Sequence, residues 1–172
     1  MFTGITLFRS FMKVHLCCGL DNFPGWLNVD AINFGFNTVA DLGKEWTFAE
    51  PGTVDYILCK DGFEHMDSPE HFLAQAAKVL KPGGVLELWV PHYKNPSAYR
   101  ITHKTYYSWN LFSVYPEPHD KVKLKVISNR LYIGRKESAV FAPLHWLINL
   151  CPKWWERLFY ASNVEVCLQR EA

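Results

Sequence analysis

The chain contains 172 residues, of which 49% are hydrophobic and 16% aromatic, and its formal net charge is +1. This length suits one domain with a sizeable core, so we expect a single domain over residues 1–172. The small charge and the lack of a basic block disfavour, without excluding, a nucleic-acid partner, because such a partner is held by many phosphate contacts.

The cysteines and the first residues bear on location. Five cysteines is an odd number, and Cys17, Cys18, Cys59 and Cys167 lie in or beside expected buried strands, which favours a reducing cytoplasm without structural disulfides. No CxxC pair is present, so we predict no metal site. Residues 1–12 are too short and too interrupted to span a bilayer and lack the features of a signal peptide. We interpret them as an extension ahead of the first strand.

The opening elements predict a nucleoside pocket. An apolar run over residues 13–18 ends in a turn with Gly19, and a second run over residues 26–30 ends on Asp30. Only residues 20–25 separate the two runs, whereas a crossover helix needs about ten or more. The first crossover helix is therefore predicted to be absent or reduced to a turn. Without a helix dipole to hold a pyrophosphate, the pocket favours a ligand that lacks phosphates.

The central segments alternate between strand and helix patterns. Residues 54–59 form a short apolar run typical of a central parallel strand. Ser68 is a suitable N-cap with Pro69 at the first helical position, and the helix is predicted to end at residues 81–84, Lys-Pro-Gly-Gly. Residues 85–90 then form another buried strand. This strand–helix–strand unit predicts a largely parallel α/β sheet.

An aromatic-rich segment follows, over residues 93–120. Its tyrosines and interspersed prolines predict an irregular cover over the carboxyl edge of the sheet, which could close on a sugar or another flat acceptor. The alternative is that these rings complete the core of a chain that lacks one helix.

The last third of the chain predicts an edge strand, helices and a final strand. Residues 121–126 alternate strictly, which predicts an edge strand with its lysines in water. Asn129 is expected to turn that strand back into a second one over residues 131–133. Residues 143–160 have a helical pattern interrupted by a proline, and residues 163–168 are expected to form the last strand.

Six short sequence motifs occur together in the order and spacing of a known family. They are residues 14–19, 25–30, 40–42, 54–57, 64–65 and 79–84. Over roughly residues 13–100 the chain resembles the class I S-adenosylmethionine-dependent methyltransferases, and among them the small bacterial and viral branch that lacks the first helix. The resemblance implies a Rossmann-like, mostly parallel sheet with flanking helices and an antiparallel last strand.

The resemblance also implies which residues hold the cofactor. Residues 16–19 would wrap its methionine part, Asp30 would accept the ribose hydroxyls, Asp41 would lie beside the adenine amino group, and residues 60–62 would line the sulfonium side. Asp30 and Asp41 could instead cap local turns. The implied cofactor-binding residues are Leu16, Cys17, Cys18, Gly19, Asp30, Asp41, Lys60, Asp61 and Gly62.

Cys17 and Cys18 depart from the family pattern, which usually has a glycine at the first or second of these places. Their side chains could crowd the cofactor. This departure keeps open a catalytically silent, S-adenosylmethionine-binding regulatory or assembly protein. A nucleic-acid methyltransferase whose recognition module lies on a partner chain is a further alternative.

The expected reaction is methyl transfer from S-adenosylmethionine to a hydroxyl of a small molecule or glycan, with S-adenosylhomocysteine as product. A hydroxyl acceptor benefits from a base, and histidine is the commonest such group. The candidate catalytic residues are His65, His92, Tyr93 and His103. An Asn-Pro-Pro-Tyr or Asp-Pro-Pro-Tyr run, typical of enzymes that methylate the amine of a DNA base, is absent.

Overall fold

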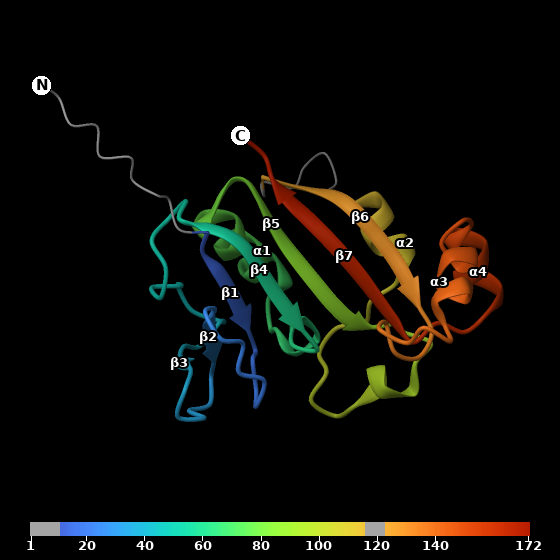
Figure 1. Cartoon of the computed structure of the whole chain (residues 1–172), viewed down its shortest axis with the longest axis horizontal. Helices are drawn as coiled ribbons and strands as arrows, with labels where there is room; N and C mark the ends of the chain where they lie inside the picture. Colours follow the sequence, from blue (N-terminus) through green and yellow to red (C-terminus); the bar gives the residue numbers. More distant parts are fainter. Residues whose placement is uncertain (1–10, 116–122) are drawn as a thin grey trace, which may run out of the picture.

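A computed structural model describes residues 11–115 and 123–172 of the chain. Within this part, the strands form one sheet in the order β3-β2-β1-β4-β5-β7-β6 (Figure 1). The strands are β1 Lys13–Leu16, β2 Leu27–Asp30, β3 Thr38–Val39, β4 Val54–Lys60, β5 Leu80–Pro91, β6 Leu124–Tyr132 and β7 Asn163–Arg170. The α-helices are α1 Pro69–Val79, α2 Trp109–Val114, α3 Ala142–Ile148 and α4 Pro152–Leu158. Two short 3-10 helices are η1 Phe63–His65 and η2 Pro96–Tyr99.

The sheet is mixed, as predicted. Strands β1 to β5 pair in parallel, whereas β7 lies antiparallel between β5 and β6. Residues 17–26 contain turns and no helix, so β1 passes to β2 without a crossover helix. The predicted fold class, a Rossmann-like α/β sheet with an antiparallel last strand and a missing first helix, is confirmed.

Helix α1 begins where the sequence predicts. The Ser68 hydroxyl accepts a hydrogen bond from the amide of His71 at 3.1 Å, and Pro69 occupies the first turn. The helix stops within one residue of its predicted end, but the chain continues differently from the prediction. It ends at Val79, and Leu80 already pairs with Val54 as the start of β5, so residues 81–84 form an irregular part of that strand and not a turn after the helix.

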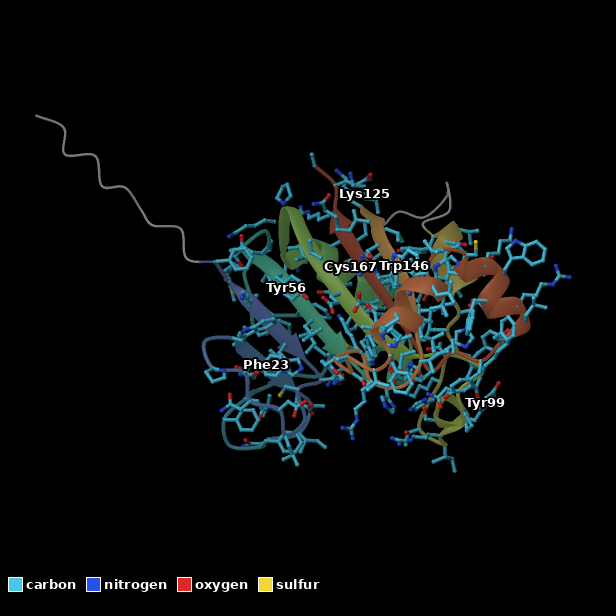
Figure 2. The ribbon with its side chains drawn as sticks, turned by 45° about the vertical axis from the view of Figure 1, so that its right-hand side comes forward. Phe23, Tyr56, Tyr99, Lys125, Trp146 and Cys167 are labelled. Atoms are coloured by element: carbon cyan, nitrogen blue, oxygen red, sulfur yellow. The ribbon has the colours of Figure 1, made fainter. Side chains whose placement is uncertain are left out.

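The two faces of the sheet are covered differently. Helices α1 and α2 lie behind the sheet in Figure 1 and contribute Phe72, Val79 and Phe112 to an apolar core. On the other face, the loop after β1 lays aromatic rings over the strands. The rings of His15 and Phe23 stack at 4.4 Å, and Phe23 and Tyr56, labelled in Figure 2, are linked through edge contacts with Trp26. This loop occupies the place of the missing helix.

Strand β6 corrects the predicted hairpin. It is continuous from Leu124 to Tyr132, with a register shift between Val126 and Ser128 and no reversal at Asn129. The Asn129 side chain donates to the carbonyl of Trp109 at 2.8 Å, which joins β6 to α2. The strand does form an edge of the sheet with Lys125 exposed, as predicted, although residues 121 and 122 lie outside the described residues.

The predicted interruption of the last helical stretch is confirmed. Helix α3 ends at Ile148 and α4 begins at Pro152, since proline lacks the amide hydrogen that a continuing helix needs. β7 then runs from Asn163 to Arg170, two residues longer than predicted. Across residues 11–115 and 123–172, no helix is long and apolar enough to cross a membrane.

Candidate functional site

The strand register gathers the predicted cofactor residues at one edge of the sheet. Leu16 of β1 pairs with Val29 of β2 on one side and with Cys59 of β4 on the other. Because these strands are parallel, the residues that follow each of them emerge at the same carboxyl edge. The turn after β1, the end of β2 and the turn after β4 therefore lie next to one another.

Asp30 is tied into this edge by the turn after β1. Its Oδ2 accepts a hydrogen bond from the Gly19 amide at 2.9 Å, and its Oδ1 accepts one from the Ile32 amide at 3.0 Å. Each carboxylate oxygen has a second lone pair, so the group retains capacity for two further donors. Gly19 has φ +53°, and a Cβ there would meet nothing within 4 Å, so there is open space above the turn. A carboxylate beside an open glycine turn fits the ribose of a nucleoside cofactor.

Cys17 packs against the turn after β4. It adopts a left-handed conformation, with φ 52°, that glycine would take more easily. A Cβ placed on Gly62 would lie 2.5 Å from both Cβ and Sγ of Cys17 and 3.2 Å from Sγ of Cys59. The hydrogen bond with the Cys17 thiol, together with burial, raises the pKa of Cys59. Gly62 is thus the residue that leaves room for a side chain at position 17.

Cys18 and Asp41 have mainly local contacts. Cys18 is buried, and burial raises the pKa of its thiol. Asp41 is exposed, and its Oδ1 accepts a hydrogen bond from the Gly43 amide at 3.0 Å. That bond and the neighbouring Lys44, whose Nζ lies 3.4 Å from Oδ2, lower the pKa of Asp41. Asp41 thus closes its own turn.

The turn after β4 borders a hollow of about 350 Å³. Asp61 has φ 49° and its amide donates to the carbonyl of Trp89 at 2.9 Å, which fixes the turn to the neighbouring strand. The lining combines charged groups with an aromatic surface. Residues that line it include Lys60, Asp61, Trp89, Arg135 and Asn163. Its volume falls within the range of small-molecule pockets.

His92 is buried and takes part in contacts that hold the fold together. It has no exposed surface, and its Nε2 lies 3.0 Å from Oε1 of Glu156. Its Nδ1 accepts a hydrogen bond from the Lys94 amide at 3.1 Å, so both ring nitrogens are engaged. The same Glu156 carboxylate accepts the amides of Trp109 and Asn110 at the start of α2. We therefore interpret His92 as part of a buried joint between β5, α2 and α4, and not as a base.

His65 and His103 lie together, which the sequence did not indicate. Their rings meet edge to face with centroids 4.7 Å apart. The Nε2 atom of His103 lies 4.0 Å from Oε1 of Glu64, which is only 1% exposed. Burial raises the pKa of Glu64 to about 7, and the nearby Asp61 charge adds to this effect. Burial and the adjacent His65 lower the pKa of His103.

The aromatic-rich segment divides between core and surface. Tyr107 is buried and stacks on Phe63 with centroids 5.1 Å apart. Tyr99 and Tyr106 are exposed. Tyr93 is half-buried, and its amide donates to the carbonyl of Tyr107 at 2.8 Å. Residues 116–120 of the predicted cover lie outside the described residues. Core completion is therefore confirmed for Tyr107, whereas a cover over the carboxyl edge stays a prediction.

Comparison with known families agrees with the fold. Residues 6–88 match a family described as methyltransferase domain. The match covers just under half of the chain, and over these residues the sequence is similar to that methyltransferase family. No curated protein sequence matches it.

Solved structures of methyltransferases share the fold of this chain. A chain of the complex between the Haloferax volcanii Trm112 methyltransferase activator and a methyltransferase is 17% identical, with TM-score 0.61, covering 94% of this chain and 82% of that one. The S-adenosylmethionine-dependent methyltransferase of Mesorhizobium loti is 13% identical, with TM-score 0.59, and the match covers 94% of this chain and 91% of that one. A methyltransferase of Archaeoglobus fulgidus is 13% identical, with TM-score 0.61, and the match covers 95% of this chain and 88% of that one. The methyltransferase resemblance that the sequence predicts is therefore confirmed, over residues 6–88 by the family match and over the fold by these structures.

Proposed function

We propose that the chain transfers a methyl group from S-adenosylmethionine to a hydroxyl of a small molecule or glycan at the carboxyl edge of the sheet. The arrangement of Asp30 under the open turn at Gly19 is the observation that carries this proposal. Bound there, the cofactor supplies an electrophilic methyl group on a sulfonium. The chain's own residues then bind the cofactor and the acceptor, orient the two toward each other and exclude water.

Each side of the edge has its own task in this proposal. Asp30 accepts the ribose hydroxyls through the lone pairs that its two backbone contacts leave free. The hollow beside Lys60 and Asp61 receives the acceptor. His65 and His103, with Glu64 beside them, are the groups that accept the hydroxyl proton. Lys60 to Gly62 join the two sides.

A second candidate is a domain that needs a partner chain. The Haloferax volcanii structure, which has the same fold, is of a methyltransferase complexed with an activator protein. The partner-dependent candidate and a silent cofactor-binding protein both predict no turnover by the isolated chain. They differ in binding, because only a silent binder holds the cofactor without help.

Calorimetric titration tests the proposal directly. We expect the purified chain to bind S-adenosylmethionine and S-adenosylhomocysteine at micromolar concentration and to ignore NAD and ATP. Asp30→Ala should weaken binding by about 1–3 kcal/mol, or roughly 5- to 150-fold, because the hydrogen bonds from the ribose hydroxyls to a charged group are lost. Asp21→Ala is the matched control, since Asp21 is an exposed carboxylate close to the same turn.

The outcomes separate the candidates. Equal affinity in wild type and Asp30→Ala would contradict the assignment of Asp30. Cofactor binding without release of S-adenosylhomocysteine, across a screen of hydroxyl acceptors, would favour the silent protein. Failure of the wild-type chain to bind either ligand would favour the partner-dependent domain.

A further inference from the structure

Three potential metal ligands converge beside the turn after β4. Glu64 and His65 belong to η1, and His103 lies in the turn that follows η2. One ligand atom from each of the three residues lies within 4.8 Å of the other two. The amide of Lys104 donates to the carbonyl of Glu64 at 2.8 Å, so the backbone itself holds the two segments together.

Hydrogen bonds to backbone carbonyls fix the tautomers of both histidines. Nδ1 of His65 lies 3.0 Å from the carbonyl oxygen of Thr102, and Nδ1 of His103 lies 3.0 Å from that of Ala98. A carbonyl oxygen can only accept, so each Nδ1 carries the proton and each neutral ring keeps the lone pair on Nε2. A backbone carbonyl that fixes the tautomer in this way is the usual outer support of a metal-bound histidine.

Glu64 provides the second, independent observation. It is only 1% exposed, and its Oε2 has no hydrogen-bond partner among the residues that the structure describes. An unpaired buried carboxylate oxygen is costly, and native proteins rarely keep one without a ligand or a function. The Nε2 atom of His103, which faces this carboxylate, is an acceptor in the tautomer just derived, so it cannot donate a hydrogen bond to it. A cation between the three groups satisfies all of them.

We propose that Glu64, His65 and His103 bind one divalent cation of the zinc class. Two imidazoles and one carboxylate form a recognised zinc-ligand set that leaves a fourth position open. Ligand atoms on one tetrahedral zinc ion lie about 3.3 Å apart, so the 4.0 Å separation of His103 Nε2 and Glu64 Oε1 must shorten slightly on binding.

The role of the cation rests on the proposed function, although its binding does not. A cation at this position withdraws charge from an oxygen in its open site and lowers the pKa of a hydroxyl there. The two imidazoles then act as ligands and no longer as bases. The cation acidifies the bound hydroxyl, and its proton passes to solvent water before the oxygen attacks the methyl group. The substrate class narrows accordingly to molecules that present an oxygen ligand, such as a diol or a hydroxy acid.

Titration with Co²⁺, followed by visible absorption, tests the site. Cys151 is exposed, so the titration uses a Cys151→Ser background to remove a thiol that binds metals on its own. We expect one Co²⁺ per chain, displaced by Zn²⁺. His103→Ala and Glu64→Gln should each weaken binding at least about 100-fold, since loss of an outer support alone costs 10- to 100-fold. His71→Ala is the control, because its Nε2 contacts the carbonyl of Lys44 on another part of the chain.

Cofactor titration on the same samples keeps the two proposals separate. Loss of metal binding in His103→Ala and Glu64→Gln, with S-adenosylhomocysteine affinity retained, would establish the site and show that the variants are folded. A wild-type chain that binds S-adenosylhomocysteine but no metal would overturn the metal site and leave the proposed function standing. Metal binding that persists in both variants, or that His71→Ala also removes, would likewise overturn it.

Discussion

The two halves of the carboxyl edge are built by different means. On the cofactor side, the turn after β1 and the end of β2 are held by backbone groups, and Gly19 reaches Asp30 only 11 residues away in sequence. On the acceptor side, buried side chains from distant segments hold the loops, and His92 meets Glu156 across 64 residues. The cofactor side therefore depends on backbone conformation and the acceptor side on a few buried polar contacts.

Gly62→Ala should have the largest effect on the free energy of unfolding, and it should act on the cofactor side. The new Cβ would lie 2.5 Å from two atoms of Cys17, a contact that real structures do not accommodate without movement. Overpacking of this kind costs about 1–3 kcal/mol, and we expect the upper end of that range in the free energy of unfolding by urea. The affinity for S-adenosylhomocysteine should fall as well, because the turn after β1 must shift.

A second substitution isolates the cause. Cys17→Gly removes both atoms that the new methyl group would meet and suits the left-handed conformation at position 17. The Gly62→Ala change should therefore cost much less in the Cys17→Gly background. Equal costs in the two backgrounds would show that the contact with Cys17 is not the source of the effect.

This difference explains what the sequence could predict. Elements whose signals are local were predictable, such as the strand that ends on Asp30, the Ser68 cap and the missing first crossover helix. The meeting of His65 with His103 was not, because it depends on how two irregular segments fold over the edge. The predicted hairpin at Asn129 was wrong for a similar reason: the side chain finds its partner in Trp109, and this long-range contact accompanies a continuous strand.

Glu156→Gln should have the next largest effect and should act on the acceptor side. The change replaces a carboxylate that accepts His92 and the amides of Trp109 and Asn110 with a group that has one acceptor oxygen and one donor nitrogen. Hydrogen bonds to a charged group are worth about 1.5–3 kcal/mol, and we expect a loss of about 2 kcal/mol in the free energy of unfolding at pH 7.

The pH dependence of that loss has a definite sign. Burial works to raise the pKa of Glu156, but the bonds from His92 and the two amides outweigh it and lower the pKa. A carboxyl with a lowered pKa stabilises the fold above its unfolded value, about 4.3, and that stabilisation disappears as the pH falls through the folded value. The gap between wild type and Glu156→Gln should therefore narrow below about pH 4.3. Glu171 is exposed near the end of β7, so Glu171→Gln should have the same free energy of unfolding as wild type at every pH.

Asp41→Asn should have the smallest effect, although Asp41 belongs to the cofactor side with Asp30. Its carboxylate is exposed, and its contact with Lys44 is an exposed ion pair of the kind that contributes little. Asparagine keeps the Oδ1 acceptor for the Gly43 amide, so the turn survives the change. At this solvent-exposed position, a hydrogen bond from the adenine amino group would replace a hydrogen bond that water already makes to the side chain. The contact therefore contributes little to cofactor affinity. Calorimetry should thus find affinity for S-adenosylhomocysteine within about threefold of wild type. A loss as large as that of Asp30→Ala would mean that the loop around Asp41 closes over the adenine and excludes water, so that both carboxylates act from a buried site.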